Sequence, residues 1–222
     1  MFSELISLEC YNIFLIVMAV IALFVFVALY FVEAGYGYLF NPKYGFPVPN
    51  KLGWVLMESP VFVVMAILWW LSPAKFEVAP LLLFAIFQTH YFQRSFIFPM
   101  LIRGNSKMPV SIMLMGATFN TLNALMQGGW LFFIVPEYFP DYYADWFSQP
   151  YIYIGVAVWL FGFITNLQSD YIIRHLRKPG DKKHYIPYGG MFRYVSSANY
   201  FGEFMEWVGY AIASWSVAGV VF

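Results

Sequence analysis

Two sets of polar side chains repeat at helical spacing in the last third of a chain that is otherwise apolar. Within each set the residues are three or four positions apart, so each set lies on one face of a helix. The first set is Asn166, Asp170, Arg174 and Arg177. The second set is Asn199, Glu203 and Glu206. Amides and carboxylates can hold sugar hydroxyls or a carboxamide, and guanidinium groups bind phosphate. The same groups could also pair with one another and only fix the intervening loop, and the sequence leaves both readings open.

Further polar side chains lie inside the apolar segments upstream. They are Glu58, Tyr91, Arg94, Asn120 and Asn123. An ionisable group within a membrane span is costly and is usually paired or functional. Glu58 could form a structural ion pair with Arg94, or in its protonated form donate a hydrogen bond to a ligand. Tyr91 could be an ordinary membrane aromatic or a second donor.

The composition identifies the setting in which these groups must be placed. The chain of 222 residues is 61% hydrophobic and only 11% charged, whereas a soluble domain carries about 25% charged residues. We therefore predict an all-α integral membrane protein that forms a single domain over residues 1–222. Apolar segments long enough to cross a bilayer are expected at 11–32, 53–72, 79–102, 109–135, 150–172 and 200–222.

The loops between these six segments are unequal in charge. Ten of the twelve lysines and arginines fall in the connections 33–52, 103–108 and 173–199, all on one side, and Lys75 is the one cation opposite. Positive loops stay cytosolic, so we expect the N-terminus outside and the loop 173–199 in the cytosol. The membrane would be the inner membrane in a bacterium or the endoplasmic reticulum in a eukaryote. In this orientation the buried polar groups gather in the cytosolic half, which predicts a cavity open to that side.

Several ligand classes are not supported by the sequence. The net charge of zero and the lack of a basic patch with interleaved aromatics argue against nucleic acid. Cys10 is the only cysteine, and the three histidines show no ligand spacing, so no metal is expected. The loop 173–199 contains neither GxGxxG nor GxxxxGK[ST], so a soluble nucleotide-binding fold is excluded. Its glycines, cations and tyrosines still suit a phosphate and an aromatic ring.

Three stretches carry a resemblance to a known family. They are LMESP from Leu56, HYFQRSFIFPMLIRG from His90 and SDYIIRHLRKPGDKKHYIPYGGMFRYVSSANYFGEFMEWVGYAIASW from Ser169. Together they resemble the motifs of the steroid 5α-reductases, in the same order, over most of the chain from about residue 54. The resemblance implies a membrane enzyme that reduces the C4–C5 double bond of a 3-oxo-Δ4-steroid, such as testosterone or progesterone, with NADPH. It also implies binding of membrane lipid, and we expect a monomer.

The resemblance also implies roles for residues at matching positions. Glu58 and Tyr91 would hold the 3-oxo group of the steroid. The residues implied for NADPH are Asn166, Asp170, Arg177, Asn199 and Glu203, with Arg94 and Arg103 matching by motif. Glu206 would hold the lattice of charges around them. Hydride arriving at the β-carbon of an enone leaves negative charge on the carbonyl oxygen, and each donor aimed there contributes about 3–4 kcal/mol.

The chain departs from the family pattern in three places. His184 and Tyr185 stand where a basic residue often precedes the Ile-Pro of the loop, and Asn105 stands where an arginine often follows Arg-Gly. The family also continues into a seventh helix beyond the position of Phe222, which this chain does not contain. We therefore expect the given sequence to be a part of a longer chain.

The sequence is also compatible with other functions. Related membrane enoyl or sterol reductases use the same oxyanion chemistry. Membrane methyltransferases that use S-adenosylmethionine also carry an Asn-Tyr-Gly-Glu-like stretch, but with an Arg-His-Pro before it, where this chain has Ser197 and Ala198. A transporter or sterol-binding protein would show inverted repeats with broken helices, and none is visible.

Overall fold

The computed structural model describes residues 7–32, 35, 40–177, 181, 183 and 185–222. The chain divides into two compact units. The first unit consists of Met1–Trp146 with Val220–Phe222, and the second of Phe147–Gly219. Both units are built almost entirely from helices, as the composition predicts.

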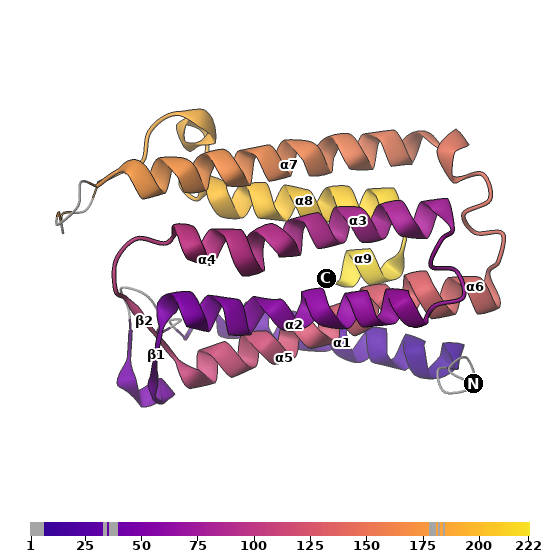
Figure 1. Ribbon diagram of the computed structural model, residues 1–222, viewed down its shortest axis with the longest axis horizontal. Helices are drawn as coiled ribbons and strands as arrows, with labels where there is room; N and C mark the ends of the chain where they lie inside the picture. The colour runs from indigo at the N-terminus through magenta and orange to yellow at the C-terminus, as the bar shows by residue number, and fades with distance from the viewer. Residues whose placement is uncertain (1–6, 33–34, 36–39, 178–180, 182, 184) are drawn as a thin grey trace. The chain divides into compact units, whose positions relative to one another are not determined.

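The first unit contains α1 (Leu8–Ala28), α2 (Asn50–Leu71), α3 (Val78–Phe92) and α5 (Val110–Gly129). A π-helical turn, Gln93–Ile97, joins α3 to α4 (Phe98–Leu101), so the predicted segment 79–102 is helical almost throughout. A second π-helical turn, Trp130–Ile134, joins α5 to α6 (Val135–Tyr138). Helices α2 and α5 lie side by side (Figure 1).

A two-stranded antiparallel ribbon, absent from the all-α prediction, ties the starts of α2 and α5 together (Figure 1). Strand β1 (Pro47–Pro49) pairs with β2 (Lys107–Pro109), with Val48 opposite Met108. Proline disfavours a helical conformation in the residue before it, so both short segments remain extended up to the helix that follows. The ribbon fixes the register of α2 against α5.

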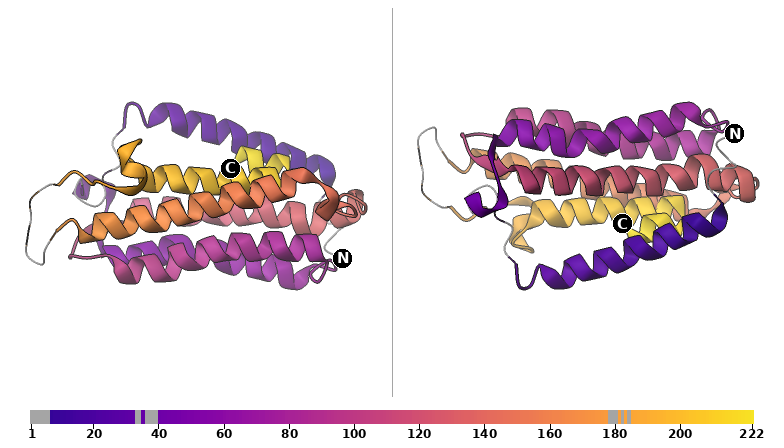
Figure 2. Two further views of the ribbon diagram at one scale, coloured as in Figure 1. Left: turned by 90° about the horizontal axis from the view of Figure 1, so that it is seen from above. Right: turned by 90° about the horizontal axis from the view of Figure 1, so that it is seen from below.

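The second unit is a pair of antiparallel helices, α7 (Pro150–His175) and α8 (Ala198–Ser214), which lie side by side (Figure 1, Figure 2). A short 3₁₀ turn, Gly190–Arg193, precedes α8. Glycines bring the two helix backbones together. A Cβ atom built on Gly162 would lie 2.5 Å from the backbone nitrogen of Glu206, and one on Gly209 would lie 2.3 Å from that of Trp159. These close approaches require the absence of a side chain.

The prediction of one continuous span at 200–222 is wrong in its second half. Helix α8 ends at Ser214, Trp215 takes a left-handed conformation with φ 49°, and the short α9 (Val217–Val221) follows. The hydroxyl of Ser216 accepts a hydrogen bond from the backbone nitrogen of Gly219 at 3.0 Å. A serine that caps a new helix in this way competes with continuation of the old one.

Three helices of the described residues are long and apolar enough to cross a membrane by length and composition. They are α1, α2 and α7, with mean hydropathies of 2.8, 1.8 and 1.5 in their most apolar windows. The predicted segments at 79–102 and 109–135 are each divided between an α-helix and a π-helical turn. The protein is thus an all-α, multi-pass membrane protein.

Candidate functional site

Glu58 is held inside the first unit by an asparagine of the neighbouring helix. It lies on α2 with 9% of its surface exposed, and Asn120 on α5 donates a hydrogen bond from Nδ2 to its Oε2 at 2.9 Å. The same Nδ2 donates to the backbone carbonyl of Met57 at 2.9 Å. One oxygen of the buried carboxyl group is therefore held by a neutral donor.

Tyr91 on α3 is held in a similar way, by an asparagine that lies one turn beyond Asn120 on α5. It is 2% exposed at the end of α3, and Asn123 donates from Nδ2 to its hydroxyl oxygen at 2.9 Å. The rings of Phe87 and His90 pack against the Tyr91 ring, each with its centroid 4.8 Å away. The π-helical turn Gln93–Ile97 begins two residues later, and such turns occur frequently at functional sites.

Arg94 lies within that π-helical turn, between aromatic rings. Its guanidinium carbon is 4.8 Å from the centre of the Trp54 ring and 4.5 Å from that of Phe98. Only 6% of Arg94 is exposed, so the cation is largely desolvated and gains from the ring quadrupoles. Arg103, which shares the motif, is exposed in the connection between α4 and β2.

Four of the residues predicted for a cofactor, Asn166, Asp170, Asn199 and Glu203, lie on α7 and α8 of the second unit, where Arg177 is exposed just beyond α7, whereas Arg94 and Arg103 belong to the first unit. On α7, Asn166 and Asp170 are 2% and 5% exposed, and Asn166 donates from Nδ2 to the backbone carbonyl of Asn199 at 2.9 Å. On α8, Glu203 is half-buried and Glu206 is fully buried. The close backbone contact between α7 and α8 thus brings the two predicted polar faces together.

In the connection between these helices, Asp181 is bonded to two of the other described residues. Its carboxylate accepts hydrogen bonds from the backbone nitrogen of Lys183 at 2.8 Å and from the hydroxyl of Tyr185 at 2.7 Å. These bonds, with the charge of Arg177, hold the pKa of Asp181 below its ordinary value, and the same contact raises the pKa of Tyr185. Tyr185, which departs from the family pattern, therefore serves the loop's own structure. His184, the other departure there, lies outside the described residues.

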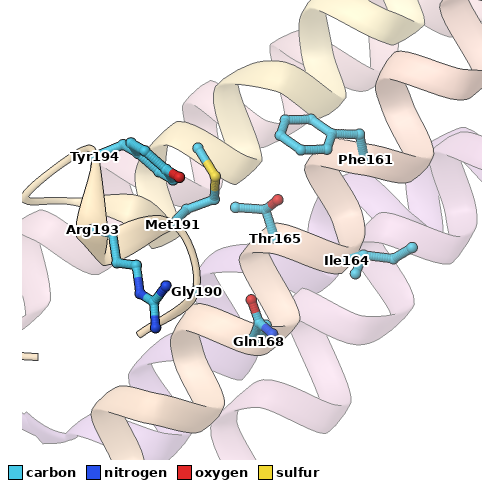
Figure 3. A pocket seen from close by; sticks show the side chains of 8 residues that line it. All are labelled: Phe161, Ile164, Thr165, Gln168, Gly190, Met191, Arg193 and Tyr194. Atoms are coloured by element: carbon cyan, nitrogen blue, oxygen red, sulfur yellow. The ribbon is translucent and has the colours of Figure 1, made fainter. Parts of the chain in front are cut away.

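A pocket of about 410 Å³ opens on a face of α7 other than the one that carries Asn166 and Asp170 (Figure 3). Phe161 and Ile164 form its apolar end, and Arg193 lies at the opposite end. Gly190, with φ 49°, lies so near Gln168 that a Cβ atom would be 2.5 Å from its Oε1 atom. The described residues that line this pocket include none of those predicted to bind the cofactor.

The sequence predicts that Asn120 and Asn123 are buried polar residues but does not identify their partners. Their spacing of three positions on one helix was the available signal, because it places both on the same face. The glycines at 155, 162, 202 and 209, which are seven positions apart in each helix, were a second signal for close packing. Arg193 was counted only as a cytosolic cation.

Comparison with known proteins gives a consistent result. The family model described as 3-oxo-5-alpha-steroid 4-dehydrogenase matches residues 106–222. The chain is 40% identical over 205 residues to "3-oxo-5-alpha-steroid 4-dehydrogenase 1" of Mus musculus, which covers 91% of this chain and 78% of the mouse protein. It is 41% identical over 189 residues to the human protein of the same name, covering 84% and 71%. It is 39% identical over 204 residues to "3-oxo-5-alpha-steroid 4-dehydrogenase 2" of Sus scrofa, covering 88% and 76%.

Proposed function

Since this chain belongs to the 3-oxo-5-alpha-steroid 4-dehydrogenase family of membrane oxidoreductases, we propose that it reduces the C4–C5 double bond of a 3-oxo-Δ4-steroid. The observation that carries the proposal is the buried pair of Glu58 and Tyr91. Both side chains are buried, and an oxygen of each accepts a hydrogen bond from an asparagine amide of α5. Family membership favours reduction over methyl transfer from S-adenosylmethionine.

The reaction needs stabilisation of charge at the 3-oxo group. Reduction at the β-carbon makes an enolate, whose negative charge resides on that oxygen. Tyr91 would donate its phenolic proton to the oxygen, and Glu58 in its protonated form would donate a second hydrogen bond. Donors that are already oriented in a water-poor site cost no reorganisation when the charge develops. The two side chains are 2% and 9% exposed, which supports this role.

NADPH would supply the hydride, and the polar residues of the second unit suit its binding. Asn166 and Asp170 are buried on α7, and Glu203 is half-buried on α8. Amide and carboxylate groups can bind the ribose hydroxyls and the carboxamide, with Asn199 among them. Arg177, Arg94 and Arg103 are proposed for the phosphates, because guanidinium groups pair with them well.

We further propose that the two units work as one reductase domain, with six membrane crossings and a monomeric state. The N-terminus would lie outside and the loop 173–199 in the cytosol, because the positive charges gather there. The many exposed apolar side chains, among them Phe24, Trp70 and Ile164, suit contact with membrane lipid. The partners are therefore lipid, NADPH and a steroid or related lipid enone.

The test is NADPH oxidation by the purified protein in detergent, with testosterone or progesterone as substrate and product analysis by mass spectrometry. We expect a product two hydrogens heavier, formed in step with NADPH oxidation. Tight NADPH binding without steroid turnover would move the search to other lipid enones, such as those of the membrane enoyl reductases. Failure to bind NADPH in a full-length chain would overturn the proposal.

A further inference from the structure

We infer that Asn120 and Asn123 are positioning residues that direct the protons of Glu58 and Tyr91 toward the substrate carbonyl. This inference rests on the proposed function. The inference extends the proposed function by giving two buried amides of α5 a role in catalysis. The pair lies on one helix face, one turn apart, and each member donates to one of the two oxygens proposed to bind the 3-oxo group.

The orientation of the Asn120 amide is fixed by the backbone. Its Nδ2 donates to the carbonyl oxygen of Met57 as well as to Glu58, both at 2.9 Å, and a carbonyl oxygen can only accept. Asn120 therefore faces Glu58 as a donor. The carboxyl oxygen that receives this bond, Oε2, is the less favourable place for a proton. A protonated Glu58 consequently carries its proton on Oε1, from which it can donate to a ligand.

The same logic holds for Tyr91. Because Asn123 donates to the phenolic oxygen, the hydroxyl proton of Tyr91 must be donated to some other atom. The bond from Asn123 also stabilises negative charge on the phenolic oxygen as its proton is shared with the substrate. One helix thus sets the direction of both donors.

The burial of these amides supports a role in the reaction. Asn120 is 6% exposed and Asn123 is fully buried, and within the described residues Oδ1 of Asn123 has no hydrogen-bond partner. A buried polar atom without a partner destabilises the fold. An apolar residue of similar size would pack here without that cost, so stability alone does not account for the asparagine.

The test compares Asn120→Leu and Asn123→Leu with the matched control Thr121→Val. Thr121 is on the same helix, and its hydroxyl only donates to the carbonyl of Ala117 at 2.8 Å. We expect each leucine variant to lower kcat by about 10-fold or more, which is the effect of losing a hydrogen bond to a group that gains charge during the reaction. The KM for the steroid and the affinity for NADPH should change by less than about 2-fold. The control should keep its kcat, because its hydroxyl touches neither oxygen.

A double-mutant cycle separates positioning from a general loss of packing. In a Glu58→Gln background, the additional change Asn120→Leu should lower kcat by less than about 2-fold. The reason is that the effect of Asn120 on the rate passes through the Glu58 carboxyl. The same should hold for Asn123→Leu in a Tyr91→Phe background. A full repeat of the loss in both backgrounds, or an unchanged kcat in an active protein, would overturn the inference. Lack of turnover by the unmodified protein would instead count against the proposed function.

Discussion

At the scale of single residues, the proposed chemistry depends on two buried oxygens, each of which accepts a hydrogen bond from a neighbouring asparagine. Glu58 and Tyr91 come from α2 and α3, and both are held by α5. Their burial excludes water, which strengthens each hydrogen bond to a developing charge. The importance of each should therefore appear in the rate of reaction rather than in steroid binding.

Replacement of either donor should lower kcat strongly. We expect Glu58→Gln and Tyr91→Phe each to reduce kcat by about 10²–10³-fold, the usual effect of losing one oxyanion donor. Steady-state kinetics with the steroid and NADPH would measure the loss. Tyr153→Phe is a matched control, because Tyr153 is 61% exposed and its hydroxyl donates to the carbonyl of Phe147. A Tyr91→Phe variant with the unmodified rate would remove Tyr91 from the mechanism.

Glu203 is proposed to bind the cofactor rather than the steroid. Glu203→Ala should raise the dissociation constant of NADPH by about 10-fold, the worth of one hydrogen bond to a charged group. Quenching of tryptophan fluorescence during NADPH titration would report the change. Glu137→Ala, at an exposed position of α6, should leave the affinity unaltered. Equal affinities in the Glu203→Ala and unmodified proteins would exclude a cofactor role for Glu203.

At the scale of elements, the antiparallel pair of α7 and α8 and the loop that joins them decide the geometry of the second unit. Glycines allow the backbones to approach, and this approach brings Asn166 within 2.9 Å of the Asn199 carbonyl. In the loop, Asp181 accepts local hydrogen bonds from Lys183 and Tyr185. Packing and loop order are therefore separable, and each can be tested alone.

A side chain at Gly162 should force α7 and α8 apart. A Cβ atom there would lie 2.5 Å from the nitrogen of Glu206 and 2.6 Å from the carbonyl oxygen of Gly202, and backbone atoms cannot move aside cheaply. We expect Gly162→Val to destabilise the protein by about 1–3 kcal/mol, seen as a lower Tm in detergent. Ala157→Val introduces the same side chain at an exposed position of α7 and should leave Tm nearly unchanged.

The Asp181–Tyr185 contact gives the loop a defined pH response. The pKa of Asp181 is lowered by the backbone nitrogen of Lys183, the Tyr185 hydroxyl and Arg177, so the contact is complete above the ordinary carboxyl pKa. It is lost only as the pH falls through the lowered value. In the other direction, Tyr185 should ionise above its ordinary pKa of 10.0. Asp181→Asn should bring that pKa down, as measured by ¹³C NMR of labelled tyrosine with Tyr185→Phe for assignment. An unshifted Tyr185 would contradict the contact.

At the scale of the whole molecule, the distribution of positive charge predicts the orientation in the membrane. Apolar helices and family membership establish a multi-pass protein, and the asymmetry of lysine and arginine predicts which side each loop faces. The single cysteine, Cys10, is exposed near the start of α1 and offers a native reporter for the side that we propose to be the outer one.

A membrane-impermeant maleimide should label Cys10 in intact cells or in sealed, right-side-out vesicles. In a Cys10→Ser background, Tyr188→Cys should react only after permeabilisation, because Tyr188 lies in the loop 173–199 and is 77% exposed. The two sites are matched controls for each other, since each reports on one face of the membrane. Labelling in the opposite order would reverse the proposed topology.

The sequence alone determined the fold class, the family and the helix faces that carry the polar residues. These follow from composition, from the spacing of Asn166 and Asp170, and from long motifs, all of which are local properties of the chain. The sequence could not decide that α8 stops at Ser214, because capping by Ser216 depends on a single hydroxyl. Nor could it give Asn120 and Asn123 their partners, because Glu58 and Tyr91 are 62 and 32 positions away in the chain. Only tertiary packing, guided by the β1–β2 ribbon, places α5 against both, since hydrogen bonds over such separations depend on how whole helices meet.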